Sequence, residues 1–106
     1  MVLVDFVFSE ESGSKRRPVL ILSSEQYLVG RQEAVVSAIT SNTRRILAGD
    51  HLMVDWETAG LLFPSVATGI IRTIKQTMID RKMGTVSQRD LIEIESNLKQ
   101  ILELKS

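Results

Sequence analysis

A bent sheet is predicted by residues 64–74, which read PSVATGIIRTI. The β-branched residues on both sides of Gly69 favour two strand segments, residues 64–68 and 70–74. Glycine inside a strand pattern is typical of a bend or a bulge, because glycine adopts backbone conformations that other residues avoid. Since a small sheet that bends in this way tends to close on itself, the segment favours a barrel over a flat sheet.

Three strands are predicted upstream of this segment. Residues 2–8 alternate with the period of two that is typical of a strand, and residues 34–39 form an apolar run that ends in a polar cluster. Residues 18–22 form another apolar run, and Pro18 suits its first position because proline has no backbone donor. Residues 9–14 are small and polar, which predicts a mobile loop between the first two strands.

The remaining sequence predicts a short extended segment and one helix. Residues 51–55 are extended and lead into one helical turn, residues 56–60, that is closed by glycine. Ser87 is expected to be the N-cap of a helix with Asp90 as a weak capping-box acid, and its apolar stripe consists of Leu91, Ile94, Leu98 and Ile101. Several short strands and one helix predict a mainly β (α+β) fold, a small antiparallel barrel with a C-terminal α-helix packed on the sheet.

Composition excludes several classes of protein. The chain has 106 residues, which is enough for one domain, and we expect residues 1–106 to form it. Cysteine is absent, so disulfides, thiolate zinc sites and cysteine nucleophiles are excluded, and a reducing cytoplasm is expected. The sequence has no phosphate-binding glycine loop, no spacing of metal ligands and no long apolar run. We therefore expect no metal, no cofactor and no membrane span.

Two basic clusters flank predicted strands, although Lys+Arg and Asp+Glu both number 13. Residues 15–17 precede one strand, and residues 44–45 follow another. RNA cleavage is a reaction that such residues support, because the ribose 2′-hydroxyl supplies the nucleophile and the protein stabilises negative charge and moves protons. From composition alone, solvated strand ends and local turn hydrogen bonds are the commoner roles. His51 is the one histidine and the candidate proton acceptor near neutral pH.

Collinear stretches over nearly the whole chain resemble the PemK/MazF family of type II toxin–antitoxin toxins. The resemblance is carried by residues 2–6 (VLVDF), 14–18 (SKRRP), 38–42 (AITSN), 64–66 (PSV), 72–74 (RTI) and 81–84 (RKMG). It implies an SH3-like barrel with a C-terminal helix, usually a homodimer. It also implies a metal-independent, sequence-specific endoribonuclease that cleaves messenger RNA through attack of the 2′-hydroxyl. The implied partners are single-stranded RNA, a cognate antitoxin, and operator DNA only as the toxin–antitoxin complex.

The same resemblance assigns the site residues. Arg17, immediately before the proline, and Thr40, at the end of the third strand, look like the family's catalytic pair. The residues expected to line the RNA groove or to contact phosphates are Ser14, Lys15, Arg16, Ser41, Asn42, Arg44 and Arg45. Arg17 would hold the scissile phosphate through its planar fork of donors, and Thr40 would orient that phosphate. The chain departs from the family pattern at Thr68, Ile70 and Lys75, where some members carry arginine or acidic residues.

Two alternative functions remain open at the level of sequence. A catalytically degenerate member of the family would bind an antitoxin or operator DNA without cleaving RNA. Related barrels poison gyrase, but those toxins depend on a tryptophan near the C-terminus, and this chain ends Leu104-Lys105-Ser106.

Overall fold

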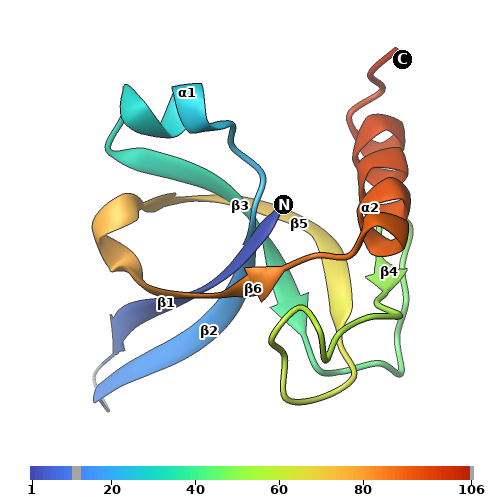
Figure 1. Cartoon of the computed structure of the whole chain (residues 1–106), viewed down its shortest axis with the longest axis horizontal. Helices are drawn as coiled ribbons and strands as arrows, with labels where there is room; N and C mark the ends of the chain where they lie inside the picture. Colours follow the sequence, from blue (N-terminus) through green and yellow to red (C-terminus); the bar gives the residue numbers. More distant parts are fainter. Residues whose placement is uncertain (11–12, 106) are drawn as a thin grey trace.

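The computed structural model describes residues 1–10 and 13–105, which form one antiparallel sheet and a set of short and long helices (Figure 1). The elements in chain order are β1 (Val2–Glu10), β2 (Gly13–Ile21), α1 (Glu25–Val29), β3 (Glu33–Thr40), β4 (His51–Leu52), β5 (Val66–Lys75), the 3-10 helix η1 (Gln76–Met78), β6 (Ile79–Thr85) and α2 (Gln88–Ile101). The strands neighbour one another in the order β4-β5-β3-β2-β1-β6. The predicted mainly β fold with a C-terminal helix is confirmed.

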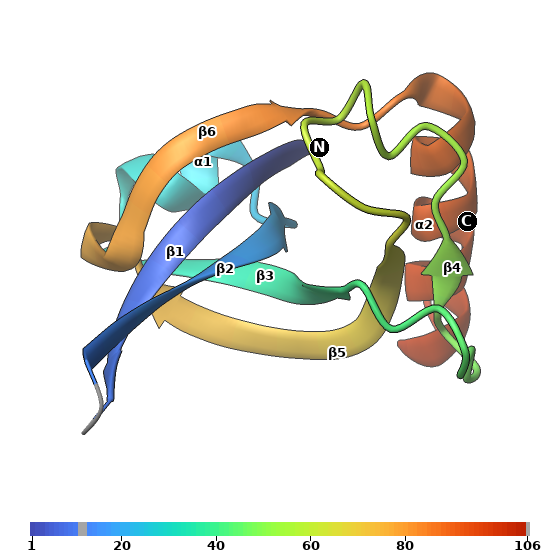
Figure 2. The same ribbon diagram turned by 90° about the horizontal axis from the view of Figure 1, so that it is seen from below.

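The sheet is strongly curled, and its two edges are β4 and β6. The segment between β4 and β5 crosses the open side toward β6 (Figure 2). The approach is close, because a Cβ on Gly60 would lie 2.5 Å from Met83 O, and a Cβ on Gly84 would overlap Ala59 O. Gly60 also has a φ of +100°, a conformation that glycine adopts readily. In the described part of the chain, the barrel therefore closes through a glycine-lined loop contact rather than through a pair of strands.

Two hydrophobic clusters lie on the two faces of the curled sheet. The alternation in β1 places Leu3 in one cluster and Val4 in the other. The first cluster includes Ile94 of α2, and the second includes Val36 of β3 and Ile74 of β5. The period of two predicted for the first strand is thus confirmed, and both of its faces carry buried side chains.

The first hairpin is longer than the sequence predicts. A mobile loop was expected over residues 9–14, but β1 continues to Glu10 and pairs there with Gly13 of β2. That expectation is wrong because the cross-strand hydrogen bonds of an antiparallel hairpin do not require apolar side chains. Residues 11–12, also part of the expected loop, lie outside the described residues. The hairpin projects as a two-stranded arm, residues 7–10 and 13–16, because β6 pairs with β1 only as far as Phe6.

Pro18 lies inside β2 and is not the first residue of the strand, as the sequence analysis expected. Leu22 donates its N–H to Val35 O of β3 at 2.9 Å, and the period of two then directs the nitrogen of Pro18 toward β3 as well. Pairing between β2 and β3 begins only at Val19. A proline is tolerated at this point because no strand of the sheet requires its N–H.

The bend predicted at Gly69 is confirmed, but it lies within one continuous strand, β5, rather than between two. The register shifts between Ser37 and Ile39 of β3, whose partners in β5 are Ile71 and Ala67, so Gly69 lies in a bulge. The extended segment at residues 51–55 is reduced to β4, while residues 56–60 form the expected turn. The sequence analysis did not assign α1, η1 or β6.

The predicted C-terminal helix is confirmed, with Ser87 as its N-cap. Asp90, however, does more than cap, since it is 1% exposed and its carboxylate accepts hydrogen bonds from Val54 N–H (2.9 Å) and Asp55 N–H (2.8 Å). Burial alone would raise the pKa of Asp90, but these bonds and His51 outweigh it, and the pKa is lowered. Asp90 therefore fixes α2 to the segment that follows β4. Neither α-helix of the described ranges has the length and apolar character to cross a bilayer.

Candidate active site

Arg17 and Thr40 lie at the same end of the ladder formed by β2 and β3. The printed pairs of these antiparallel strands run from Ile21↔Val36 to Val19↔Ala38. The ladder ends at Val19↔Ala38, so Arg17 and Thr40 each lie two residues beyond its last pair, and the period of two gives them the same face of the sheet. The guanidinium and the hydroxyl thus come from neighbouring strands at the point where the ladder opens after Pro18.

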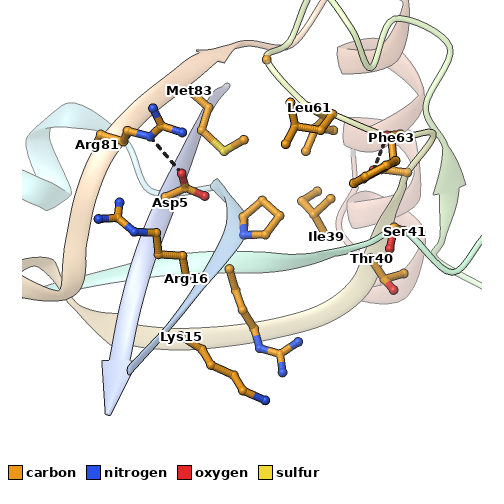
Figure 3. Close-up of a pocket in the computed structure, with 15 residues that line it drawn as sticks. Asp5, Lys15, Arg16, Ile39, Thr40, Ser41, Leu61, Phe63, Arg81 and Met83 are labelled. Carbon is orange, nitrogen blue, oxygen red and sulfur yellow. Dashed lines mark hydrogen bonds and ion pairs between the residues drawn. The ribbon is translucent and has the colours of Figure 1, made fainter. Parts of the chain in front are cut away.

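A groove of about 670 Å³ lies at this opening (Figure 3). Its walls come from β1, β2, β6, the end of β3 and the loop before β5, and its lining residues are Asp5, Lys15, Arg16, Arg17, Pro18, Ile39, Thr40, Ser41, Gly60, Leu61, Leu62, Phe63, Ser65, Arg81 and Met83. Arg17 and Thr40 are both among them. Of the residues expected to bind RNA, Lys15, Arg16 and Ser41 also line the groove.

The remaining expected RNA contacts lie outside this lining. Ser14 is on the hairpin arm, opposite Ser9. Arg44 and Arg45 are exposed on the loop after β3. The Oδ1 of Asn42 accepts a hydrogen bond from Arg44 N–H at 3.2 Å, which is turn chemistry within that loop. The role of these four residues in RNA binding stays a prediction.

The hydroxyl of Thr40 is held by its own loop. Asn42 N–H donates to Thr40 Oγ1 at 3.1 Å. Because the oxygen acts as acceptor in this bond, the hydroxyl keeps its proton for donation to a second partner.

Two ion pairs involve residues that line the groove, and neither pair is predicted from the sequence. Arg81 Nε donates to Asp5 Oδ2 at 3.1 Å, and Asp5 is 7% exposed. Arg16 pairs with Asp80, the residue before Arg81 on β6. The sequence could have predicted a partner for Asp5, because this acid lies in the apolar strand at residues 2–8 and a buried carboxylate requires a partner.

The groove is positively charged although the whole chain is neutral. Lys15, Arg16, Arg17 and Arg81 line it, and Asp5 is the one carboxylate among its lining residues. Such a surface attracts a polyanion and stabilises extra negative charge on a bound phosphate. Among the side chains of residues 1–7 and 13–105, no group of three or more His, Cys, Asp or Glu could hold a metal ion.

His51 and Thr68 lie outside the groove lining and have structural partners. His51 Nε2 is 2.8 Å from Asp90 Oδ1, on the side of the sheet covered by α2. Thr68 Oγ1 donates to Ala38 O at 2.7 Å and accepts from Ile70 N–H at 3.2 Å, which secures the bulge of β5. These contacts give both residues partners in the framework of the sheet, away from the groove lining.

Comparisons with known proteins show the family of the chain and support its fold. The sequence profile described as "PemK-like, MazF-like toxin of type II toxin-antitoxin system" matches residues 1–102. The curated protein Endoribonuclease MazF6 of Mycobacterium tuberculosis is 32% identical over 94 residues, which are 86% of this chain and 82% of that protein. The solved structure of the Mycobacterium tuberculosis toxin MazF-mt6 has a TM-score of 0.75 at 26% identity and covers 97% of this chain and 99% of its own. A MazE-MazF structure from Deinococcus radiodurans shares the fold, with a TM-score of 0.79 at 18% identity over 98% of this chain and 94% of its own.

Proposed function

The chain belongs to the PemK-like, MazF-like toxins of type II toxin–antitoxin systems, and on that premise we propose that the groove at the open end of β2 and β3 cleaves messenger RNA. The activity is that of an endoribonuclease toxin. The observation that supports this assignment of the site is that Arg17 and Thr40, a permanent cation and a hydroxyl, both line the same basic groove.

The reaction is a transesterification within the RNA. The ribose 2′-oxygen forms a bond to the adjacent phosphorus, the bond from phosphorus to the 5′-oxygen breaks, and the products are a 2′,3′-cyclic phosphate and a 5′-hydroxyl. One proton leaves the 2′-hydroxyl and one is delivered to the 5′-oxygen. Arg17 binds the non-bridging oxygens through its planar fork and stabilises the charge added in the transition state, and Thr40 donates to the same phosphate. No metal ion takes part in these steps.

The test is cleavage of a long RNA by the purified protein in EDTA. Removal of a donor aimed at a developing charge lowers kcat by roughly 100- to 1000-fold, so Arg17→Ala and Thr40→Ala should both be strongly impaired. Arg31→Ala is the matched control, because Arg31 is an exposed arginine outside the groove lining. Intact RNA at high concentrations of the wild-type protein would favour the degenerate binding module, and equal activity of Arg17→Ala and Arg31→Ala would move the active site elsewhere.

The partners follow from the same groove. We propose that a cognate antitoxin silences the enzyme by laying an acidic segment along these cations, since complementary charge favours that association. Single-stranded RNA is the substrate, the cytoplasm is the compartment, and operator DNA is bound only as the toxin–antitoxin complex. We also propose that residues 1–106 act as one domain and form a homodimer. Light scattering after gel filtration measures the dimer, and titration with the antitoxin against RNA cleavage measures competition for the groove.

A further inference from the structure

An exposed aromatic ring stands at the rim of the groove. Phe63 is 64% exposed, although it lines the groove together with the buried Leu61 and Ile39. Figure 3 shows the ring at the end of the groove where Thr40 and Ser41 terminate β3. A large apolar side chain that stays in water next to a basic surface indicates a binding role more than a packing role.

The ring opens onto a second hollow. A pocket of about 380 Å³ is lined by Ser41, Thr43, Phe63 and Pro64. Ser41 and Phe63 line both this pocket and the groove, so the two are continuous. The pocket thus presents one aromatic face and two hydroxyl side chains directly beside Thr40.

The backbone that carries the ring is fixed. Ser65 Oγ donates to Phe63 O at 2.8 Å, and Ser65 itself is 3% exposed. Met53 N–H donates to Ser65 O at 3.0 Å, which ties the segment to the core. Pro64 restricts the backbone between the two residues. Little conformational freedom remains to be lost from this segment when a ligand stacks on the ring.

We propose that Phe63, Ser41 and Thr43 form a subsite that stacks and reads one unpaired nucleobase of the RNA next to the scissile phosphate. The inference rests on the proposed function of the groove. A base has a flat π-face for the ring and polar edges for the two hydroxyls, and its backbone phosphate lies toward the cations of the groove. A protein segment would use the apolar ring but has no requirement for hydroxyls beside a phosphate site, which favours the base.

The experiment compares Phe63→Ala, Phe63→Trp and the control Val29→Ala on one RNA. Val29 is an exposed apolar residue, 89% accessible, on α1 and outside the groove lining. Cleaved ends are first mapped with the wild-type protein, and kcat/KM is then measured on a short RNA that contains the mapped site. Phe63→Ala should lower kcat/KM roughly 10- to 100-fold, as for the loss of one base stack, while Phe63→Trp and Val29→Ala stay near wild type.

A second arm identifies the base. RNAs with an abasic nucleotide at each position around the cut are cleaved by the wild type and by Phe63→Ala. At one position, the abasic nucleotide should lower the kcat/KM of the wild type by as much as the Phe63→Ala substitution lowers it on intact RNA. At that same position, the abasic nucleotide should cause no further loss of kcat/KM in the Phe63→Ala variant. Additive losses at every position, or equal activity of Phe63→Ala and Val29→Ala, overturn the subsite. Loss of antitoxin binding or of dimerisation without loss of cleavage also overturns it and assigns Phe63 to a protein interface. Failure of the wild type to cleave would instead contradict the proposed function.

Discussion

Replacement of Asp90 by alanine should destabilise the protein more than any surface change on α2. The carboxylate accepts two backbone hydrogen bonds, from Val54 N–H and Asp55 N–H, and contacts His51. Each buried donor left without an acceptor costs about 1–3 kcal/mol. For a side chain only 1% exposed, we expect the free energy of unfolding to fall by about 3–5 kcal/mol, the range for removing one member of a buried charged network.

The assay is urea denaturation at pH 7, followed by the fluorescence of the single tryptophan, Trp56. Glu93→Ala is the matched control, because Glu93 is an exposed acid on the same helix and its removal should change stability by less than about 0.5 kcal/mol. A loss of less than about 1 kcal/mol for Asp90→Ala would refute the account, since even one orphaned donor costs that much.

The dependence on pH provides an independent check of the same account. Because the pKa of Asp90 in the folded protein lies below its ordinary value of 3.8, the charged carboxylate contributes its stability above that value. The contribution is lost as the pH falls toward the lower folded pKa. The difference in stability between the wild type and Asp90→Asn should therefore be constant above about pH 5 and narrow below about pH 4. A difference that widens in acid would contradict the reasoning.

Three further results are expected. His51→Gln should reduce the midpoint of urea denaturation. It should lower kcat by far less than the roughly 100-fold or more that loss of a general base causes, and a loss of that size in single-turnover cleavage would assign His51 to the active site. Lys15→Ala should weaken RNA binding in filter-binding titrations. The slope of log K against log salt should fall by roughly 0.7, the value for one phosphate contact to a single strand, and an unchanged slope would show that Lys15 of the groove contacts no phosphate. Gly60→Ala should cost at least about 2 kcal/mol because φ is +100° and the new Cβ meets Met83 O, whereas Gly30→Ala, whose Cβ meets only an ordinary contact, should be nearly neutral in thermal unfolding.

Hydrophobic periodicity predicts much of this fold. Alternation over residues 2–8 distributes Leu3 and Val4 between two clusters, and the stripe containing Ile94 packs α2 on the sheet. Local pattern fails where backbone hydrogen bonds act without apolar side chains, as in the arm built on Gly13. It also fails for β6, in which no residue is buried and every residue is either half-buried or exposed. These elements form because a neighbouring strand offers a partner, and that information is not local.

The candidate active site, like the fold, is only partly predictable from local sequence pattern. Arg17 and Thr40 are predicted from motif resemblance, and both line the groove at the end of the β2–β3 ladder. Asp5 and Arg81 are 76 positions apart and meet only because β6 returns beside β1, so no spacing in the sequence connects them. Phe63 gives no sequence signal at all, since its exposure depends on the loop that closes the barrel.

Pro18 divides β2 into two parts that have different neighbours. On one side of it, β2 has two neighbours and its alignment with β3 is fixed; on the other, the hairpin has only itself to pair with. Residues inserted or deleted at the hairpin tip would change the reach of the arm, while β2 would keep its register with β3 from Val19 onward. We therefore expect the tip to tolerate changes of length better than the part of β2 that pairs with β3, which makes it a suitable place to graft new recognition elements.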